Sequence, residues 1–441
     1  MKRPKRHRIR GTIISTLTFA MIVGGIGAAV YYGKRTLDAR AAPPWDDATA
    51  ALAEKVGEAH GLPTPDPVQV IELDAPTYTT SFSKSMLDIT DDNLAQTGAE
   101  LRAVGLLQGN LDLAGVGATA ATARPAFYDR QTNEIFVLQG LPPTVRSRAL
   151  AVALTELLAW QQGEATTADP AALLGMQLVI DGDARVTGEA VVPTVEQWDM
   201  PPAIAGIAAV APMSPYLVDR LSGDVGTSAA ARRAPDAAAR GVLISQRPTS
   251  DAVVVDASRP ETAAPTLRDS AGNTSRGLVY WYYALAGRIP SEEAWSAALA
   301  WDGDAITTSS MNGVACISAT IVTRDQAGRD LLFAALERWA AAGPIEASSA
   351  VSLQGDRIAV SACDPGPTLV TISSVEVNRF GSAPQELEIV ATTGAVGDEQ
   401  RGCVVQAVRG FGLAAMVRAG QQADVDPVVA AIGDACATTG P

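Results

Sequence analysis

Residues 146–186 dominate the sequence: they read RSRALAVALTELLAWQQ at 146–162, GEATTAD at 163–169 and PAALLGMQLVIDGDARV at 170–186. In the first segment apolar residues recur at helical spacing on both sides of Glu156, which predicts an amphipathic and mostly buried helix. Asp169 followed by Pro170 is a favourable helix start, because aspartate caps a first turn and proline is tolerated at its first position. The stretch therefore predicts two helices joined by a short polar loop.

The segment FYDRQTNEIFVLQGLPPTVRSRALAVALTELLAWQQ at 127–162 resembles the strand and active-site helix of membrane-anchored zinc metallopeptidases of actinobacterial envelopes, a gluzincin-like family. In that family a strand precedes a helical H-E-x-x-H motif, and a glutamate in an EGDA-like turn on the next helix completes the zinc site. The resemblance places Thr155, Glu156 and Ala159 at the three functional positions of the motif, and Asp181 of DGDA at the third ligand.

The resemblance runs in order over about residues 50–340. It includes Pro248, Thr249 and Ser250, with the family's acidic residue displaced to Asp251, and a Trp301 to Asp304 segment similar to a G-W-G-G-D turn. It implies an α+β, zincin-like fold: a mostly helical domain with a small sheet. It also implies that the strand at 134–138 is a sheet edge along which an extended peptide can be laid.

The chain lacks the residues that such a zinc site requires. Residues at i and i+4 share a helix face and can present two imidazoles to one zinc ion, and catalytic zinc keeps three protein ligands. Thr155 is a poor ligand, Ala159 is none, and the two histidines of the chain are His7 and His60. We therefore expect no catalytic residue, metal or cofactor here, and we interpret the four matched positions as vestiges. His60 ends a helix predicted at 46–61, where we expect it to interact with the helix dipole.

Three interpretations of Glu156 and Asp181 remain open. In the first, they are leftover polar groups that an arginine or a backbone donor satisfies in a partly closed cleft. In the second, they join Asp183 in a carboxylate cluster for a hard cation such as calcium, which takes oxygen ligands. In the third, the pair performs metal-independent acid/base hydrolysis, for instance of a glycoside, as carboxylates about 5 to 9.5 Å apart can do.

The beginning of the chain predicts a membrane anchor. Residues 1–10 form a basic head, residues 11–32 carry no charge and are long enough to cross a bilayer as a helix, and residues 33–45 form a polar stalk. Because a basic head stays in the cytoplasm, we expect a single-pass cell-membrane protein with its C-terminal part extracellular. A cleaved signal peptide ending near residues 39–41 is the alternative.

The charge of the chain is distributed unevenly. The net charge is −14, yet the first 35 residues hold eight basic side chains and no acidic one, so the remainder is strongly acidic. Phosphate contacts need clustered cations, and this argues against nucleic acid as a partner of the remainder.

Beyond the stalk we expect a degenerate metallopeptidase-like domain at 46–310 and a disulfide-bonded α+β region at 311–441. The second region shows an alternating strand at 312–323, a helix ending at Gly343, a hairpin that turns at Gly355, and a helical hairpin at its end.

All four cysteines follow the predicted anchor. An even number in an exported region indicates disulfides, here two, for which three pairings are possible. We favour Cys316–Cys363, on neighbouring strands, and Cys403–Cys436, across the last helical hairpin.

Together these features predict a membrane-anchored pseudo-enzyme that holds a peptide or an envelope protein on the outer face of the cell in the inherited cleft. The alternatives are a calcium-binding or metal-independent envelope hydrolase that uses Glu156 and Asp181, and a purely structural ectodomain whose cleft is closed.

Overall fold

The computed structural model describes residues 45–121, 124–162, 170–196, 198, 215–222, 248–256, 259 and 275–367. Contacts divide the chain into two units, Met1–Trp45 with Pro67–Gln69, and Asp46–Asp66 with Val70–Pro441. In the described part of the first unit, the indole Nε1 of Trp45 donates a hydrogen bond to the carbonyl oxygen of Val68 at 2.8 Å. The second unit contains the candidate site.

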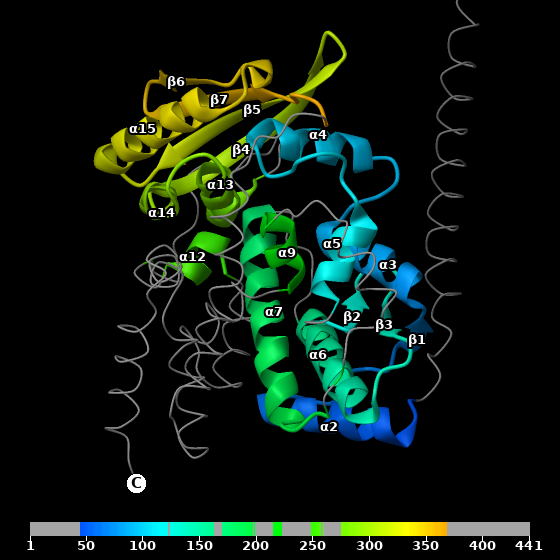
Figure 1. The fold of residues 1–441 in the computed structure, drawn as a ribbon. Helices are drawn as coiled ribbons and strands as arrows, with labels where there is room; N and C mark the ends of the chain where they lie inside the picture. The colour runs from blue at the N-terminus through cyan, green and yellow to red at the C-terminus, as the bar shows by residue number, and fades with distance from the viewer. Residues whose placement is uncertain are drawn as a thin grey trace, which may run out of the picture. The chain divides into compact units, whose positions relative to one another are not determined.

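The described residues up to 255 are mainly helical (Figure 1). Several helices begin at side-chain caps, as where Asp46 and Asp74 each accept a hydrogen bond from the backbone N–H three residues later. The predicted pair is present as α6 and α7, which pack against each other. The helices are α2 (Asp47–His60), α3 (Ala75–Leu87), α4 (Leu94–Val104), α5 (Leu113–Ala120), α6 (Pro143–Gln162), α7 (Pro170–Val191), α9 (Pro215–Ser222) and α12 (Asp251–Val255).

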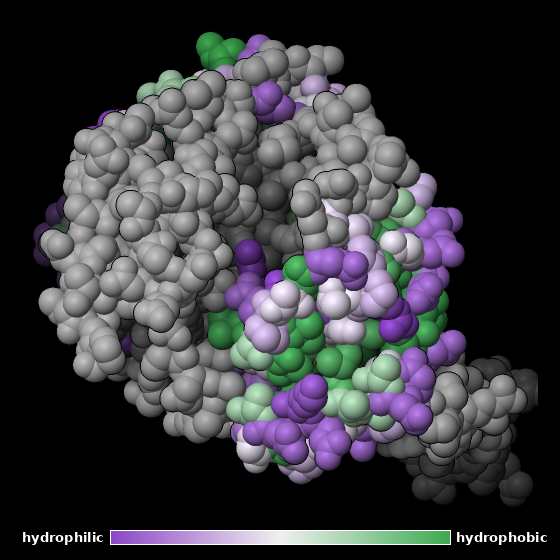
Figure 2. All heavy atoms as spheres, turned by 60° about the horizontal axis from the view of Figure 1, so that its bottom comes forward, coloured by the Kyte–Doolittle hydropathy of each residue, from purple (hydrophilic) through white to green (hydrophobic). Residues whose placement is uncertain are grey.

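Helix α2 agrees with the prediction at 46–61 and lies on the surface of its unit. Its exposed positions combine alanines with charged residues, and its buried side faces α6 and α7. Figure 2 shows the face on the side of α2, where polar residues surround an apolar area.

A small sheet contains β1 (Gln69–Leu73), β2 (Ala126–Asp129) and β3 (Glu134–Leu138), in the order β1-β3-β2. β2 and β3 are antiparallel, with Phe127 opposite Phe136. β3 has the predicted bounds, but the expectation that it is an edge strand is wrong. Residues 126–129 form a strand of their own, which pairs with β3 and takes the edge position next to α6.

The second sheet has the order β4-β5-β7-β6, and every neighbouring pair in it is antiparallel. Helix α15 packs on it, with α13 and α14 nearby (Figure 1). The hairpin predicted around Gly355 is present, and Gly355 has a φ of 68°, which suits a residue without a side chain. The elements are α13 (Gly277–Ala286), α14 (Ser291–Ala298), β4 (Trp301–Met311), β5 (Val314–Thr323), α15 (Gln326–Ala342), the 3₁₀ helix η1 (Ile345–Ala347), β6 (Ala350–Gln354) and β7 (Arg357–Cys363).

β4 differs from the prediction in two respects. The segment Trp301 to Asp304, interpreted as a turn, is extended and begins this strand. The strand then runs to Met311 and pairs along its length with β5. The domain boundary that the sequence suggested, between residues 310 and 311, therefore falls inside a hairpin.

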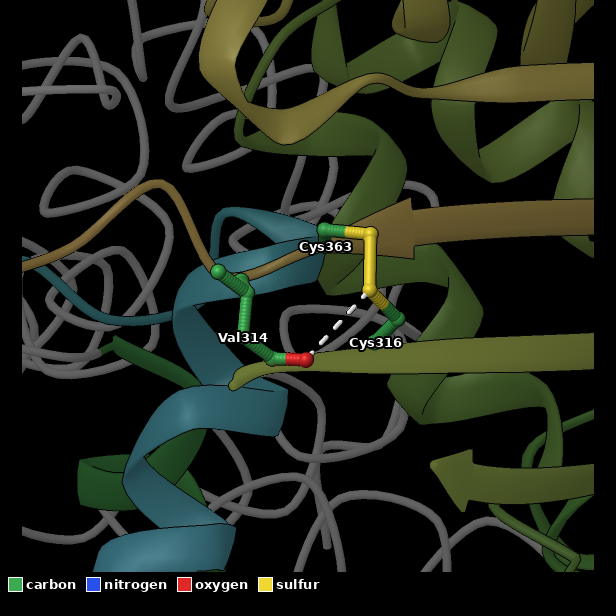
Figure 3. The surroundings of a disulfide bond; sticks show 3 residues. All are labelled: Val314, Cys316 and Cys363. Carbon is green, nitrogen blue, oxygen red and sulfur yellow. Dashed lines mark hydrogen bonds between the residues drawn. A yellow bond between two sulfur atoms is a disulfide. The ribbon is translucent and has the colours of Figure 1, made fainter. Parts of the chain in front are cut away.

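The predicted Cys316–Cys363 disulfide is present (Figure 3). The two cysteines lie opposite each other on the paired strands β5 and β7, with their Cα atoms 3.9 Å apart. The Sγ atom of Cys316 lies 3.7 Å from the carbonyl oxygen of Val314. The predicted Cys403–Cys436 pair and the last helical hairpin lie outside the described residues.

Helix α13 occupies the core, since each of its residues is buried. Its aromatic run at 280–283 packs edge-on against neighbouring rings, including Tyr216 and Trp295. At its N-terminus, Asp251 accepts the backbone N–H groups of Leu278 and Val279 at 3.1 and 2.8 Å. Aromatic packing thus joins α13 to α9 and α14, and the capped terminus joins it to α12.

The mixed α+β class is confirmed for the described residues. Within those same residues, no helix is both long and apolar enough to span a bilayer. The anchor predicted at 11–32 lies outside them.

Candidate functional site

Helices α6 and α7 bring the two matched carboxylates, Glu156 and Asp181, to one place. Both flank the guanidinium of Arg124, which pairs with Glu156 Oε1 through one terminal nitrogen and with Asp181 Oδ1 at 3.1 Å through the other. Arg124 and Glu156 are buried, whereas the Asp181 side chain is 18% exposed. These three residues therefore form an ion-paired triad. Asp181 is its most exposed member and lines a pocket.

Further contacts fix the position of Arg124, which lies just before β2. Its backbone carbonyl accepts the Tyr78 hydroxyl at 2.5 Å, and its guanidinium carbon lies 5.7 Å from the centre of the Phe82 ring. Burial alone would lower the pKa of Arg124, but Asp181 and Glu156 raise it above its usual value. The guanidinium is thus held as a permanent cation.

Glu156 has its second oxygen occupied as well. Oε2 accepts the backbone N–H of Tyr128 at 3.0 Å. Burial raises the pKa of Glu156, while Arg124 and the Tyr128 N–H act in the opposite direction. Both oxygens of Glu156 are thus engaged by groups of the protein, inside a buried environment.

Thr155 and Ala159, the two positions at which the resemblance would place histidines, are packed inside the protein. Thr155 is buried, and its hydroxyl donates to the carbonyl oxygen of Ala151 at 2.8 Å, one turn earlier in α6. Ala159 belongs to the hydrophobic core. Among the residues that the structure describes, no group of three or more His, Cys, Asp or Glu is arranged to hold a metal ion.

The prediction that Asp183 joins Glu156 and Asp181 in a carboxylate cluster for calcium is wrong, because Asp183 lies in a different environment. Its Oδ2 lies 2.8 Å from Nε2 of His60, and Thr187 donates to its Oδ1 at 3.3 Å. Asp183 points away because it lies two residues beyond Asp181, on another side of α7.

His60 ends α2, as predicted, but it is not a surface residue. It is 7% exposed, and its Nδ1 lies 2.8 Å from the carbonyl oxygen of Val56 while its Nε2 faces Asp183. His60 and Asp183 thus tie α2 to α7 inside the core. The chain gave no signal for this contact, because 123 residues separate the partners.

A pocket opens beside the triad. Glu156 and Trp160 lie one turn apart on α6, and Gln177 and Asp181 one turn apart on α7, so each helix turns one face into it. The pocket is narrow and partly open to solvent. The lining residues are Ser85, Met86, Arg124, Tyr128, Arg130, Glu156, Trp160, Gln177, Ile180, Asp181 and Arg220.

The edge of β2 is only partly available for an added strand. The Tyr128 N–H, which points away from β3, is donated to Glu156. A peptide laid along β2 would have to do without this donor or displace the carboxylate. The added peptide strand that the resemblance implied would therefore be obstructed at Tyr128.

Sequence reasoning missed Arg124 as the partner of both carboxylates. It expected an arginine or a backbone donor in general, and both types are present. Arg124 stands 32 residues before Glu156, outside the helix pair, so periodicity gave no reason to choose it. A search for basic residues in the segment before α6 would have identified Arg102, Arg124 and Arg130 as candidate partners of the two carboxylates.

Comparison of the chain with models of protein families, with curated proteins and with solved structures finds no significant match. The description of the site therefore depends on its own geometry.

Proposed function

We propose that this protein is a non-catalytic, zincin-like binding protein that holds a peptide or protein partner in the pocket beside Arg124. The observation that carries the proposal is the position of the guanidinium between Glu156 and Asp181, where the resemblance would place a zinc ion. A cation built into the chain pairs with both carboxylates.

This arrangement favours binding over catalysis on chemical grounds. A zinc ion lowers the pKa of a bound water and polarises a carbonyl, whereas a guanidinium has no open coordination position and supplies only hydrogen bonds and charge. Metal-independent hydrolysis is disfavoured for a different reason: Arg124 pairs with both carboxylates and restrains the groups that would act as general acid and base. The pocket, however, remains accessible through Asp181 and its neighbours.

We place the protein at the cell membrane with its globular part outside. The uncharged stretch at 11–32 behind a basic head supports a single-pass anchor. The Cys316–Cys363 disulfide supports export, because such bonds persist in oxidising compartments.

A peptide-retention assay tests the proposal. The full-length chain is purified in detergent, incubated with a mixed peptide library with and without added zinc chloride, and separated from unbound peptide. Mass spectrometry then identifies the retained peptides and any cleavage products. We expect retained, uncut peptides in both conditions.

Two variants with the same Ser→Trp substitution, one inside the pocket and one outside it, show whether retention depends on the pocket. Ser85→Trp fills the space with an indole, whereas Ser310→Trp adds the same side chain at an exposed position on β4. Only Ser85→Trp should abolish retention. Cleavage that depends on zinc, or equal retention by both variants and the unaltered chain, would overturn the proposal.

A further inference from the structure

The pocket is lined by more guanidinium groups than carboxylates. Its lining holds three arginines, Arg124, Arg130 and Arg220, but only two carboxylates, Glu156 and Asp181. Arg124 pairs with both carboxylates. Among the described residues, the other two guanidinium groups make no direct ion pair with these carboxylates, although the charge of Asp181 acts on Arg130.

Arg130 follows β2 directly and is held by an aromatic ring. Its guanidinium carbon lies 4.4 Å from the centre of the Trp160 ring, and within the described residues this side chain makes no ion pair. Stacking leaves the edge of the guanidinium, with its N–H groups, free to meet a ligand. Burial lowers the pKa of Arg130, the carboxylates of Asp88 and Asp181 act in the opposite direction, and the charge of Arg220 lowers it further.

Arg220 reaches the same pocket from α9. One terminal nitrogen donates to the side-chain oxygen of Gln177 on α7 at 2.8 Å. This partner is neutral, so it orients the guanidinium without cancelling its charge. Arg130 and Arg220 thus present two oriented cations to one space from different elements.

We infer that this pocket recognises the carboxylate of a peptide, held by Arg130 and Arg220, with Met86 and Ile180 contacting the adjoining apolar part. The inference rests on the proposed function, because it names the chemistry of the ligand in that cleft. Arginine suits a carboxylate, since its planar fork can donate two parallel hydrogen bonds.

Acidic residues near the pocket do not replace the ligand. Asp88 and Asp129 act on Arg130 through their charge. Each already accepts other hydrogen bonds: Asp88 from the side chain of Gln131, and Asp129 from the backbone N–H of the same residue. Neither residue lines the pocket. The two cations therefore remain available on the side from which a ligand enters.

Isothermal titration calorimetry of the full-length chain with three blocked tripeptides tests the inference. Acetyl-Ala-Leu-Ala with a free C-terminal carboxylate is compared with its C-terminal amide and with amidated acetyl-Ala-Asp-Ala. The first and third arms distinguish a terminal from a side-chain carboxylate. We expect at least one of them to bind and the neutral amide to bind about ten- to a hundredfold more weakly, the loss expected for a hydrogen bond to a charged group.

Variants assign the effect to the two arginines. Arg130→Gln and Arg220→Gln should each weaken the carboxylate peptide by about tenfold or more, with Lys at either position restoring part of the affinity. Arg146→Gln is the matched control, because Arg146 pairs with Glu72 outside the pocket and should leave binding unchanged. Thermal unfolding of each variant verifies that it is folded; if either Gln variant is not, the Lys variants carry the test.

The outcomes separate the two proposals. Equal binding of the acid and amide peptides, or undiminished binding by the Arg130 and Arg220 variants, would overturn the carboxylate site and leave peptide binding intact. Binding of inorganic phosphate without either carboxylate peptide would also overturn it. If none of the three peptides binds, the carboxylate site fails, while the library assay with Ser85→Trp still decides the proposed function.

Discussion

At the scale of single residues, Arg124 is the side chain on which the character of the site depends. It lies between a fully buried glutamate and a partly buried aspartate, which without it would repel each other at low dielectric. Burying a pair of charges in this way adds little net stability, but removing one partner is costly, because the other is left without compensation. The triad is therefore sensitive to loss of its cation.

We predict that Arg124→Met lowers the free energy of unfolding by about 3 to 5 kcal/mol at neutral pH. Urea unfolding of the full-length chain, followed by tryptophan fluorescence, measures this change. Arg146→Met serves as control, since it breaks an ion pair between half-exposed side chains and should cost at most about 1 kcal/mol. Similar losses in the two variants would contradict the role given to the triad.

At the scale of elements, two segments that the sequence analysis selected for their family resemblance have a structural role at the N-terminus of α13. The Pro248 to Asp251 and Trp301 to Asp304 segments converge there. Asp251 bonds the first N–H groups of the helix, and Asp304 accepts hydrogen bonds from Ser275, the Arg276 backbone and Trp281. A residue with a side chain could not replace Gly277, which has a φ of 82° and whose added Cβ would lie 2.5 Å from an Asp251 oxygen.

The pH dependence of this cap follows from the burial of Asp251, which raises the pKa of its carboxyl from 3.8 to about 6. In the folded chain this group binds its proton more tightly than in the unfolded chain, so its contribution to stability is greatest below about pH 4 and is lost as the pH rises through 6. The difference corresponds to about 3 kcal/mol.

We therefore predict that Asp251→Asn, which stays uncharged, removes this part of the pH dependence. The free energy of unfolding of the unaltered chain, minus that of the variant, should fall by about 3 kcal/mol between pH 4 and pH 7. Urea unfolding at four pH values measures it. A difference that stays constant over this range would show that Asp251 keeps its ordinary pKa in the fold.

At the scale of the whole second unit, contacts between distant segments hold the four-stranded sheet to the helices. Arg102 on α4 forms a two-bonded pair with Asp364, 262 residues later, just after β7. The Cys316–Cys363 disulfide closes a loop of 47 residues between the two central strands. Both restraints act near the same end of the sheet, and α4 contacts both of those strands.

We predict that replacing both Cys316 and Cys363 by serine lowers the free energy of unfolding by about 4 kcal/mol, the loop-closure value for this separation. Calorimetry or urea unfolding measures the change. Leaving Cys403 and Cys436 unchanged and working without reductant confines the effect to this bond. A loss below about 1 kcal/mol would contradict the stabilisation expected from loop closure.

The sequence by itself determined the elements whose causes are local. Helical periodicity predicted α6, the Asp169–Pro170 pair predicted the start of α7, alternation predicted β5, and Gly355 marked a hairpin, because each depends on residues within a few positions of one another. The pairing of Cys316 with Cys363 was also within reach, since both stood on strands that were expected to be neighbours. The missing histidines needed no structure at all.

Only the tertiary structure decided how distant polar groups are paired. Arg124 with Glu156 and Asp181, His60 with Asp183, and the edge position of β2 all depend on how elements far apart in the chain pack together. A buried charge requires a partner, but the sequence does not say which one, because any arginine of the chain satisfies the same chemical need. The packing of α6, α7 and β2 makes that choice, and it sets the ion-paired triad in the wall of a pocket.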